Sequence, residues 1–344
     1  MPLLTRKTAI PQRTAVPILA EASFGRESER GSDPGSGKSG SYPPDSYEAV
    51  TYESGAVASG RPGSGEVSSV GRLFSRCANT GCSSGWLHLL RSRTSPVFEG
   101  GWNCSASCTE DRLRSSIRRE LEGRGGGEER HRHRVPLGLL MLEQGWITSI
   151  QLRRALEAQK ASGGGRLGQW LVRQQGVSEQ MVTRALGLQW SCPVLPLEFH
   201  DGEGLTPMVP RLFLDAFGAL PLRVAAGKLL YLGFENCLDP VLALAMERMT
   251  GLRVESGLVQ GSLFRPAHER MLNAVFPPVE LLEASSEPAL VRALGRAVER
   301  AKPVDSRLVR VHDCLWLRMW RRPQTGPVPE ADMVQDMICT IGSH

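Results

Sequence analysis

Apolar and polar positions follow a helical period in two windows near the middle of the chain. The first window covers residues 136–159 and the second covers residues 166–189, so they lie thirty positions apart. Each predicts a short helix, a turn and a second helix that begins after a capping residue, Thr148 or Ser178. The identical pairs are Leu137/Leu167, Gly138/Gly168, Gln144/Gln174, Arg154/Arg184, Ala155/Ala185, Leu156/Leu186 and Gln159/Gln189. A repeat of this kind predicts two copies of one αα-hairpin.

After the repeat, short apolar runs alternate with amphipathic segments. The predicted elements are an extended run at 192–199, a helix at 210–217, strands at 219–227 and 228–236, a helix at 239–250, a strand at 252–259 and a helix at 262–274. The two strands around Gly227 predict a hairpin, and Pro277 and Pro278 end the unit. The pattern therefore predicts an α+β fold, with tandem helical hairpins followed by a small α/β unit.

The two ends of the chain differ from this middle part in composition and in hydrophobic pattern. Residues 1–68 are rich in Gly, Ser, Pro and charge, which predicts a disordered segment, and 123–134 reads as a linker. At the other end, 287–301 predicts a helix, 306–320 a strand or a pair of strands, and 332–340 a short helix. The predicted regions are 1–68, 69–122, 123–134, 135–282, and a C-terminal helix and strand extension at 283–344.

Four of the eight cysteines have a spacing typical of metal sites. Cys77, Cys82, Cys104 and Cys108 form a C-x4-C-x21-C-x3-C pattern, and the second pair lies where a helix is expected to begin. Paired thiolates of this kind predict a small zinc-finger-like unit within 69–122, with unligated cysteines as the alternative. The histidines at 88, 131 and 133 are weaker candidates for metal ligands, because two lie in a basic linker.

The doubled motif RLGxxLVxxGxIxxxxLxxALxxQ resembles the N-terminal domain of type II secretion and type IV pilus assembly ATPases, the GspE N-terminal family. Within that family it is most similar to the MshEN type, which binds cyclic di-GMP. The resemblance covers about residues 135–277. It implies a ligand site shared by the two copies, and the matching positions here are Leu137, Gly138, Leu142, Gln159, Arg166, Leu167, Gly168, Leu171 and Gln189.

Two positions depart from the family motif. Pro136 stands where the first copy should begin with arginine, and Gln175 replaces the second glycine of the second copy, with Gly176 one residue later. Proline has neither the charge nor the donors with which a guanidinium binds phosphate or guanine. Arg134, two residues earlier, is the nearest basic residue that could replace it.

No enzymatic centre is expected. The segment 32–39 imitates a phosphate-binding loop, but Ser32 replaces its first glycine and prolines follow at 43 and 44. The ATPase domain that usually follows this module is not seen, and the histidines at 200, 268 and 312 are isolated in the sequence. We therefore expect a non-catalytic regulatory or docking module rather than an enzyme.

Charge and hydropathy narrow the expected partners. The net charge of +5 is spread over 344 residues, so nucleic acid is not an expected ligand, and no apolar run is long enough for membrane insertion. The expectation is a cytoplasmic bacterial protein that senses cyclic di-GMP and docks on a secretion or pilus component. The alternatives are an interaction scaffold whose nucleotide site has decayed and a zinc-finger protein that binds nucleic acid.

Overall fold

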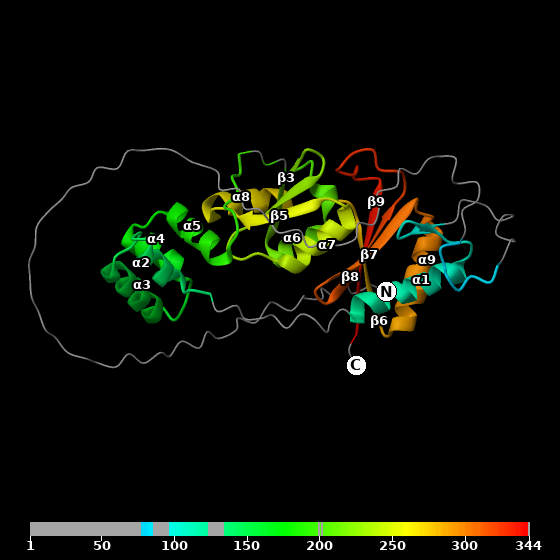
Figure 1. Cartoon of the computed structure of the whole chain (residues 1–344), viewed down its shortest axis with the longest axis horizontal. Coiled ribbons are helices and arrows are strands. Elements are labelled where there is room, and N and C mark those ends of the chain that lie inside the picture. The colour runs from blue at the N-terminus through cyan, green and yellow to red at the C-terminus, as the bar shows by residue number, and fades with distance from the viewer. Residues whose placement is uncertain (1–76, 85–95, 123–133, 199, 201, 343–344) are drawn as a thin grey trace, which may run out of the picture. The chain divides into compact units, whose positions relative to one another are not determined.

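The structure is a computed structural model that describes residues 77–84, 96–122, 134–198, 200 and 202–342. The predicted disordered segment 1–68, with its phosphate-loop-like stretch, lies outside these residues, as do most of the linker and the histidines at 88, 131 and 133. The fold is α+β, as predicted (Figure 1). Among the described helices, none has both the length and the apolar character needed to span a membrane.

Tandem hairpins form as the repeat predicts (Figure 1, green helices). The hydroxyl of Thr148 accepts a hydrogen bond from the backbone N–H of Gln151, and Ser178 accepts one from Met181, so both predicted N-caps are confirmed. The four helices are α2 (Leu137–Glu143), α3 (Ser149–Ala161), α4 (Leu167–Gln175) and α5 (Glu179–Trp190).

Equivalent residues of the two copies build one shared core. The buried members include three matched pairs, which are Met141/Leu171, Ile147/Val177 and Ala155/Ala185. Each is at most 6 % exposed, so the repeat preserves the positions that pack inward. Leu186 also packs against the core of the following unit, which ties α5 to it.

The α/β unit follows the predicted order. Its elements are a short 3-10 helix η4 (Thr206–Met208), α6 (Arg211–Phe217), β3 (Ala219–Ala225), β4 (Leu229–Phe234), α7 (Pro240–Thr250), β5 (Arg253–Leu258) and α8 (Gly261–Leu272). Strand β4 lies between β3 and β5, antiparallel to the first and parallel to the second. The extended run expected at 192–199 is reduced to one bridge, between Val194 and Leu258. Pro193 has no N–H, so it cannot extend that bridge into a ladder.

A second sheet occupies the C-terminal part. Its elements are β6 (Val279–Ala284), α9 (Glu287–Ala301), β7 (Asp305–Val311), β8 (Cys314–Trp320) and β9 (Val334–Ile341), in the sheet order β6-β9-β8-β7. The short helix expected at 332–340 was wrong, because these residues form β9 between β6 and β8. Met333, Val334, Met337 and Ile338 are all buried, and their spacing imitates a helical stripe although a central strand buries both faces.

The cysteine-bearing segment packs on this C-terminal sheet. It forms β1 (Val97–Phe98), β2 (Gly101–Trp102) and α1 (Ala106–Glu122). The backbone N–H of Val97 donates to Pro303 at 3.1 Å, and Leu113 shares a buried cluster with Leu294 of α9. The described parts of the regions predicted separately at 69–122 and 283–344 therefore share one core, and residues 134–277 are inserted between them in sequence.

An ion pair holds this combined unit to the α/β unit. Glu120 of α1 is 7 % exposed, and its carboxylate accepts hydrogen bonds from the guanidinium of Arg248 in α7 and from the backbone N–H of Arg310. Burial disfavours the charged form of Glu120, but the bonds from Arg248 and Arg310 hold its pKa below the ordinary value. The carboxylate thus stays ionised where three elements meet.

A buried arginine and aspartate lie at the centre of the second sheet. Arg318 of β8 and Asp336 of β9 are each 1 % exposed, and two bonds of 2.7 Å join them. Arg318 also donates to the carbonyl of Met208 at 3.0 Å, and the indole of Trp316 donates to Asp336 at 2.8 Å. The network satisfies both charges and attaches η4 to the sheet.

Replacing Arg318 by methionine should destabilise the chain by about 3–5 kcal/mol, because Asp336 would remain charged and unpaired in the interior. Urea unfolding followed by circular dichroism measures this change. The matched control is Arg321→Met, since Arg321 is exposed just beyond the end of the same strand. Equal stability of the two variants would contradict the role given to the pair.

Candidate functional site

The two copies meet where their first helices begin. A Cβ on Gly138 would lie 2.6 Å from Leu152 of its own copy and 3.1 Å from Leu167 of the other copy. A Cβ on Gly168 would lie 2.6 Å from Val182 and 3.7 Å from Leu137. Because Leu152 matches Val182 and Leu137 matches Leu167, the contacts are equivalent on both sides. We call the meeting point of Leu137, Gly138, Leu167 and Gly168 the seam.

The glutamine that ends each motif binds a backbone carbonyl directly before the start of the other motif. The amide of Gln159 donates to the carbonyl of Gly165 at 2.6 Å, and that of Gln189 donates to Val135 at 2.7 Å. Each acceptor directly precedes the leading position of the opposite motif. Each glutamine therefore holds the residue that leads into the first helix of the other copy. The motif alone did not reveal this role.

The other predicted ligand residues have different environments. Arg166 is the exposed N-cap residue of α4, and its side chain makes no hydrogen bond or ion pair with any described residue. Leu142 is half-buried, whereas Leu171 is wholly buried in the core of the hairpins. The structure thus brings the seam residues together. Arg166 directly precedes Leu167 of the seam, and its guanidinium donors have no described partner. Leu171 packs in the core and is not exposed to a ligand.

The two departures from the motif are accommodated differently. Gly145 and Gly176 both adopt positive φ, at 68° and 64°, so each supplies the left-handed turn that ends its first helix. The turn comes one residue later in the second copy, where α4 has 9 residues and α2 has 7. Gln175 therefore lengthens a helix without removing the turn. Pro136 is the N-cap residue of α2 and makes no side-chain cap bond.

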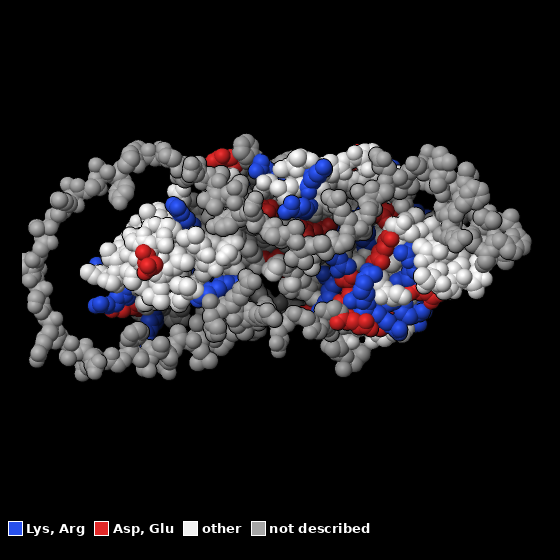
Figure 2. All heavy atoms as spheres, in the orientation of Figure 1, with Lys and Arg blue, Asp and Glu red and all other residues white. Residues whose placement is uncertain are grey.

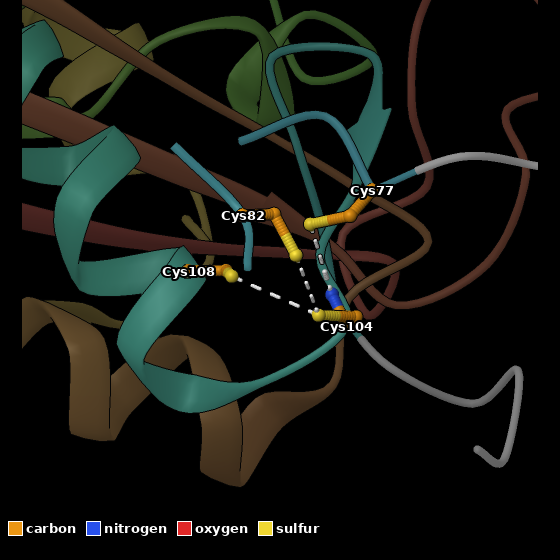
Figure 3. A group of neighbouring side chains, drawn as sticks. All are labelled: Cys77, Cys82, Cys104 and Cys108. Carbon is orange, nitrogen blue, oxygen red and sulfur yellow. Dashed lines mark hydrogen bonds between the residues drawn. The ribbon is translucent and has the colours of Figure 1, made fainter. Parts of the chain in front are cut away.

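The four predicted cysteines converge as the spacing indicates (Figure 3). All four sulfur atoms lie within 4.8 Å of one another. The sulfur of Cys104 is 3.5 Å from that of Cys82 and 3.7 Å from that of Cys108. These separations are far longer than the roughly 2.05 Å of a disulfide. A cluster of four free thiols in this arrangement could hold a metal ion.

Local structure explains how the cysteines meet. Cys104 follows β2, Cys108 lies in the first turn of α1, and Cys77 and Cys82 belong to a short segment held by the bond from the Ala78 N–H to the Trp102 carbonyl. Burial raises the pKa of the Cys77 thiol to about 12. Hydrogen bonds from the Ser84 backbone and side chain lower the pKa of Cys82 to about 6. Cys77 and Cys82 therefore differ in their readiness to ionise.

Arg112 was not identified from the sequence, yet it braces the cysteine cluster. One guanidinium nitrogen donates to the carbonyls of Phe98 and Gly101, at 2.6 and 3.0 Å, and reaches Asn103 beside Cys104. It fixes the hairpin of β1 and β2 against α1. The sequence offered no signal for this role, because a helix arginine is usually solvated.

Basic residues near the cluster are balanced by acids. In the right-hand part of Figure 2, Lys and Arg side chains lie beside those of Asp and Glu. On α1, Arg114 pairs with Asp111, and Arg118 pairs with Glu287 of α9. Phosphate backbones are bound by groups of cations free of acidic partners. Within the described residues of α1, Arg114, Arg118 and Arg119 are each paired with an acidic residue in this way.

Comparison with known proteins gives similarity over part of the chain. A solved structure of MshE with cdg aligns at 26 % identity, covering 40 % of this chain and 99 % of that one, with a TM-score of 0.33. The N-terminal domain of XpsE aligns at 24 % identity, covering 38 % of this chain and 90 % of that one, with a TM-score of 0.22. At these TM-scores the alignments do not establish a common fold. No family model and no curated protein matches the chain.

Gly168→Ala should destabilise the chain by about 1–3 kcal/mol, because the added methyl would lie 2.6 Å from Val182 of α5, the other helix of the same copy. Thermal or urea unfolding measures the loss. Arg173→Ala is the matched control, since Arg173 is exposed on the same helix and alanine suits a helix. If Gly168→Ala is as stable as the control, the close packing of α4 against α5 is wrong.

Proposed function

We propose that the tandem hairpins bind cyclic di-GMP across the seam and act as a non-catalytic regulatory or docking module. The observation that carries this proposal is the equivalence of the two sides, in which Gly138 faces Leu167 and Gly168 faces Leu137. A cyclic dinucleotide presents two identical halves, so a pair of equivalent half-sites matches it. The sequence resemblance to the MshEN type supports the same ligand.

Arg166 gives the second half-site its charge. It stands at the leading position of the motif and is exposed, and its side chain has no described partner, so its guanidinium donors are available to a ligand. A guanidinium makes paired hydrogen bonds to phosphate or to a guanine edge. Half-buried Leu137 and Leu167 supply apolar surface between the half-sites. Gln159 and Gln189 contribute by fixing the backbone just before the first helix of each copy.

The output of binding is proposed to be altered docking on a secretion or pilus component in the cytoplasm. Leu186 of α5 packs against both the hairpin core and the core of the α/β unit. Glu179, at the start of α5, accepts hydrogen bonds from the backbone N–H of Ser262 and the side chain of Gln260 at the start of α8. A movement of the hairpins on ligand binding would therefore be transmitted to the α/β unit through these contacts of α5.

Arg166→Ala should weaken binding of cyclic di-GMP by about tenfold to a hundredfold, because charge-assisted hydrogen bonds contribute on the order of 1.5–3 kcal/mol. Isothermal titration calorimetry of the full chain measures the affinity. Arg173→Ala, seven residues further along in the same helix, should bind as the unmodified chain does. No heat with the unmodified chain at high micromolar ligand would remove the sensor proposal and leave the scaffold alternative.

We also propose that Cys77, Cys82, Cys104 and Cys108 hold a structural zinc ion. Four thiolates around zinc at about 2.3 Å form a tetrahedron with sulfur–sulfur edges of about 3.8 Å. The separations of 3.5 and 3.7 Å at Cys104 fit such a tetrahedron. The ion would supply cross-linking rather than reaction chemistry, since all four ligands come from the protein.

Cys108→Ser should reduce bound zinc from about one equivalent per chain to nearly none and should lower the melting temperature, because a closed site of four thiolates loses a ligand. Plasma mass spectrometry of the purified full chain measures the metal. Cys237→Ser is the control, since Cys237 is exposed and outside the cluster. Zinc-free unmodified protein, or full zinc content in the Cys108 variant, would contradict the assignment.

A further inference from the structure

The first half-site lacks the charge that Arg166 gives the second, because Pro136 stands at the equivalent position. We propose that Arg134 supplies the missing guanidinium, held in place by Trp190. This inference rests on the proposed function, since it names a further binding residue of the same dinucleotide site. It makes the two half-sites alike in charge although their sequences differ.

The chain around Arg134 is fixed at the entrance to the first copy. The next residue, Val135, accepts a hydrogen bond from the amide of Gln189 at 2.7 Å. Gln189 is the last motif residue of the second copy, so this bond joins the approach to α2 to the end of α5. The backbone on which Arg134 stands is therefore attached to the body of the hairpins two residues before the seam begins.

The side chain of Arg134 is held as well. Its guanidinium carbon lies 3.3 Å from the centre of the Trp190 ring, a stacked arrangement that favours a cation. Trp190 is partly buried against the core of the α/β unit, so the ring is a fixed platform. Stacking uses the face of the guanidinium and leaves the N–H groups along its edge available.

The donors of Arg134 have no other use in the described part of the chain. The residue is exposed, and it makes no hydrogen bond or ion pair with a described residue. A guanidinium oriented in this way can offer two parallel N–H groups to a phosphate or to the edge of a guanine. Its conformational freedom is already reduced by the stacking, which lowers the entropic cost of binding.

The entrance to the second copy has no such pair, which indicates compensation. At the positions thirty residues away, Gly164 matches Arg134 and Lys160 matches Trp190. The entrance to the copy that keeps the leading arginine thus has neither the earlier arginine nor the aromatic platform. The entrance to the copy that carries Pro136 has both.

Titration calorimetry of the full chain with cyclic di-GMP tests this assignment. Arg134→Ala should weaken binding by about tenfold to a hundredfold, as expected for the loss of charge-assisted bonds. Adding Pro136→Arg to that variant should restore affinity to within a few-fold of the unmodified chain, because it places a guanidinium at the motif position. Arg153→Ala, which removes an exposed arginine on α3, is the control for net charge and should change little.

The outcomes separate the two proposals. If Arg134→Ala binds like Arg153→Ala while Arg166→Ala is weakened, the role of Arg134 is overturned and the proposed function stands. If Arg134→Ala is weakened but Pro136→Arg does not restore binding, Arg134 acts through the fold and the assignment is also overturned. Absence of binding by the unmodified chain overturns both.

Discussion

The tight packing around Gly138 and Gly168 is the constraint on which the candidate site depends. A methyl group on Gly138 would lie 2.6 Å from Leu152, and one on Gly168 would lie 2.6 Å from Val182, each within its own copy and closer than two carbon atoms can pack. The methyl on Gly138 would also lie 3.1 Å from Leu167 of the other copy. The bonds of Gln159 and Gln189 then fix how the chain enters each first helix. The equivalence of the half-sites follows from this packing.

The other described segments, which are far apart in sequence, pack together beside the hairpins. The cysteine cluster holds the start of α1, and α1 packs on α9 and the second sheet. The carboxylate of Glu120 connects that helix to α7 through Arg248. The buried pair of Arg318 and Asp336 connects the same sheet to η4. The carboxylates of Glu120 and Asp336, each bound by several donors, thus join segments that are far apart in the sequence.

Local signals in the sequence predicted local structure well. The capping residues Thr148 and Ser178, the hairpin of β3 and β4 and the helix 287–301 were confirmed, and the cysteine spacing correctly predicted a cluster. Long-range pairing was not predictable, since α1 meets α9 across 190 residues, as in the bond from Thr109 to Glu299. The strand β9 was mistaken for a helix because burial on both faces removes the alternation that identifies a strand.

If both copies form one ligand site, the backbone amides of Gly138 and Gly168 should both sense the ligand. Nuclear magnetic resonance of the labelled full chain, titrated with cyclic di-GMP, would follow the two signals separately. Both resonances should shift along the same binding curve and reach their end points at one ligand per chain. A response at only one glycine, or at neither, would contradict it.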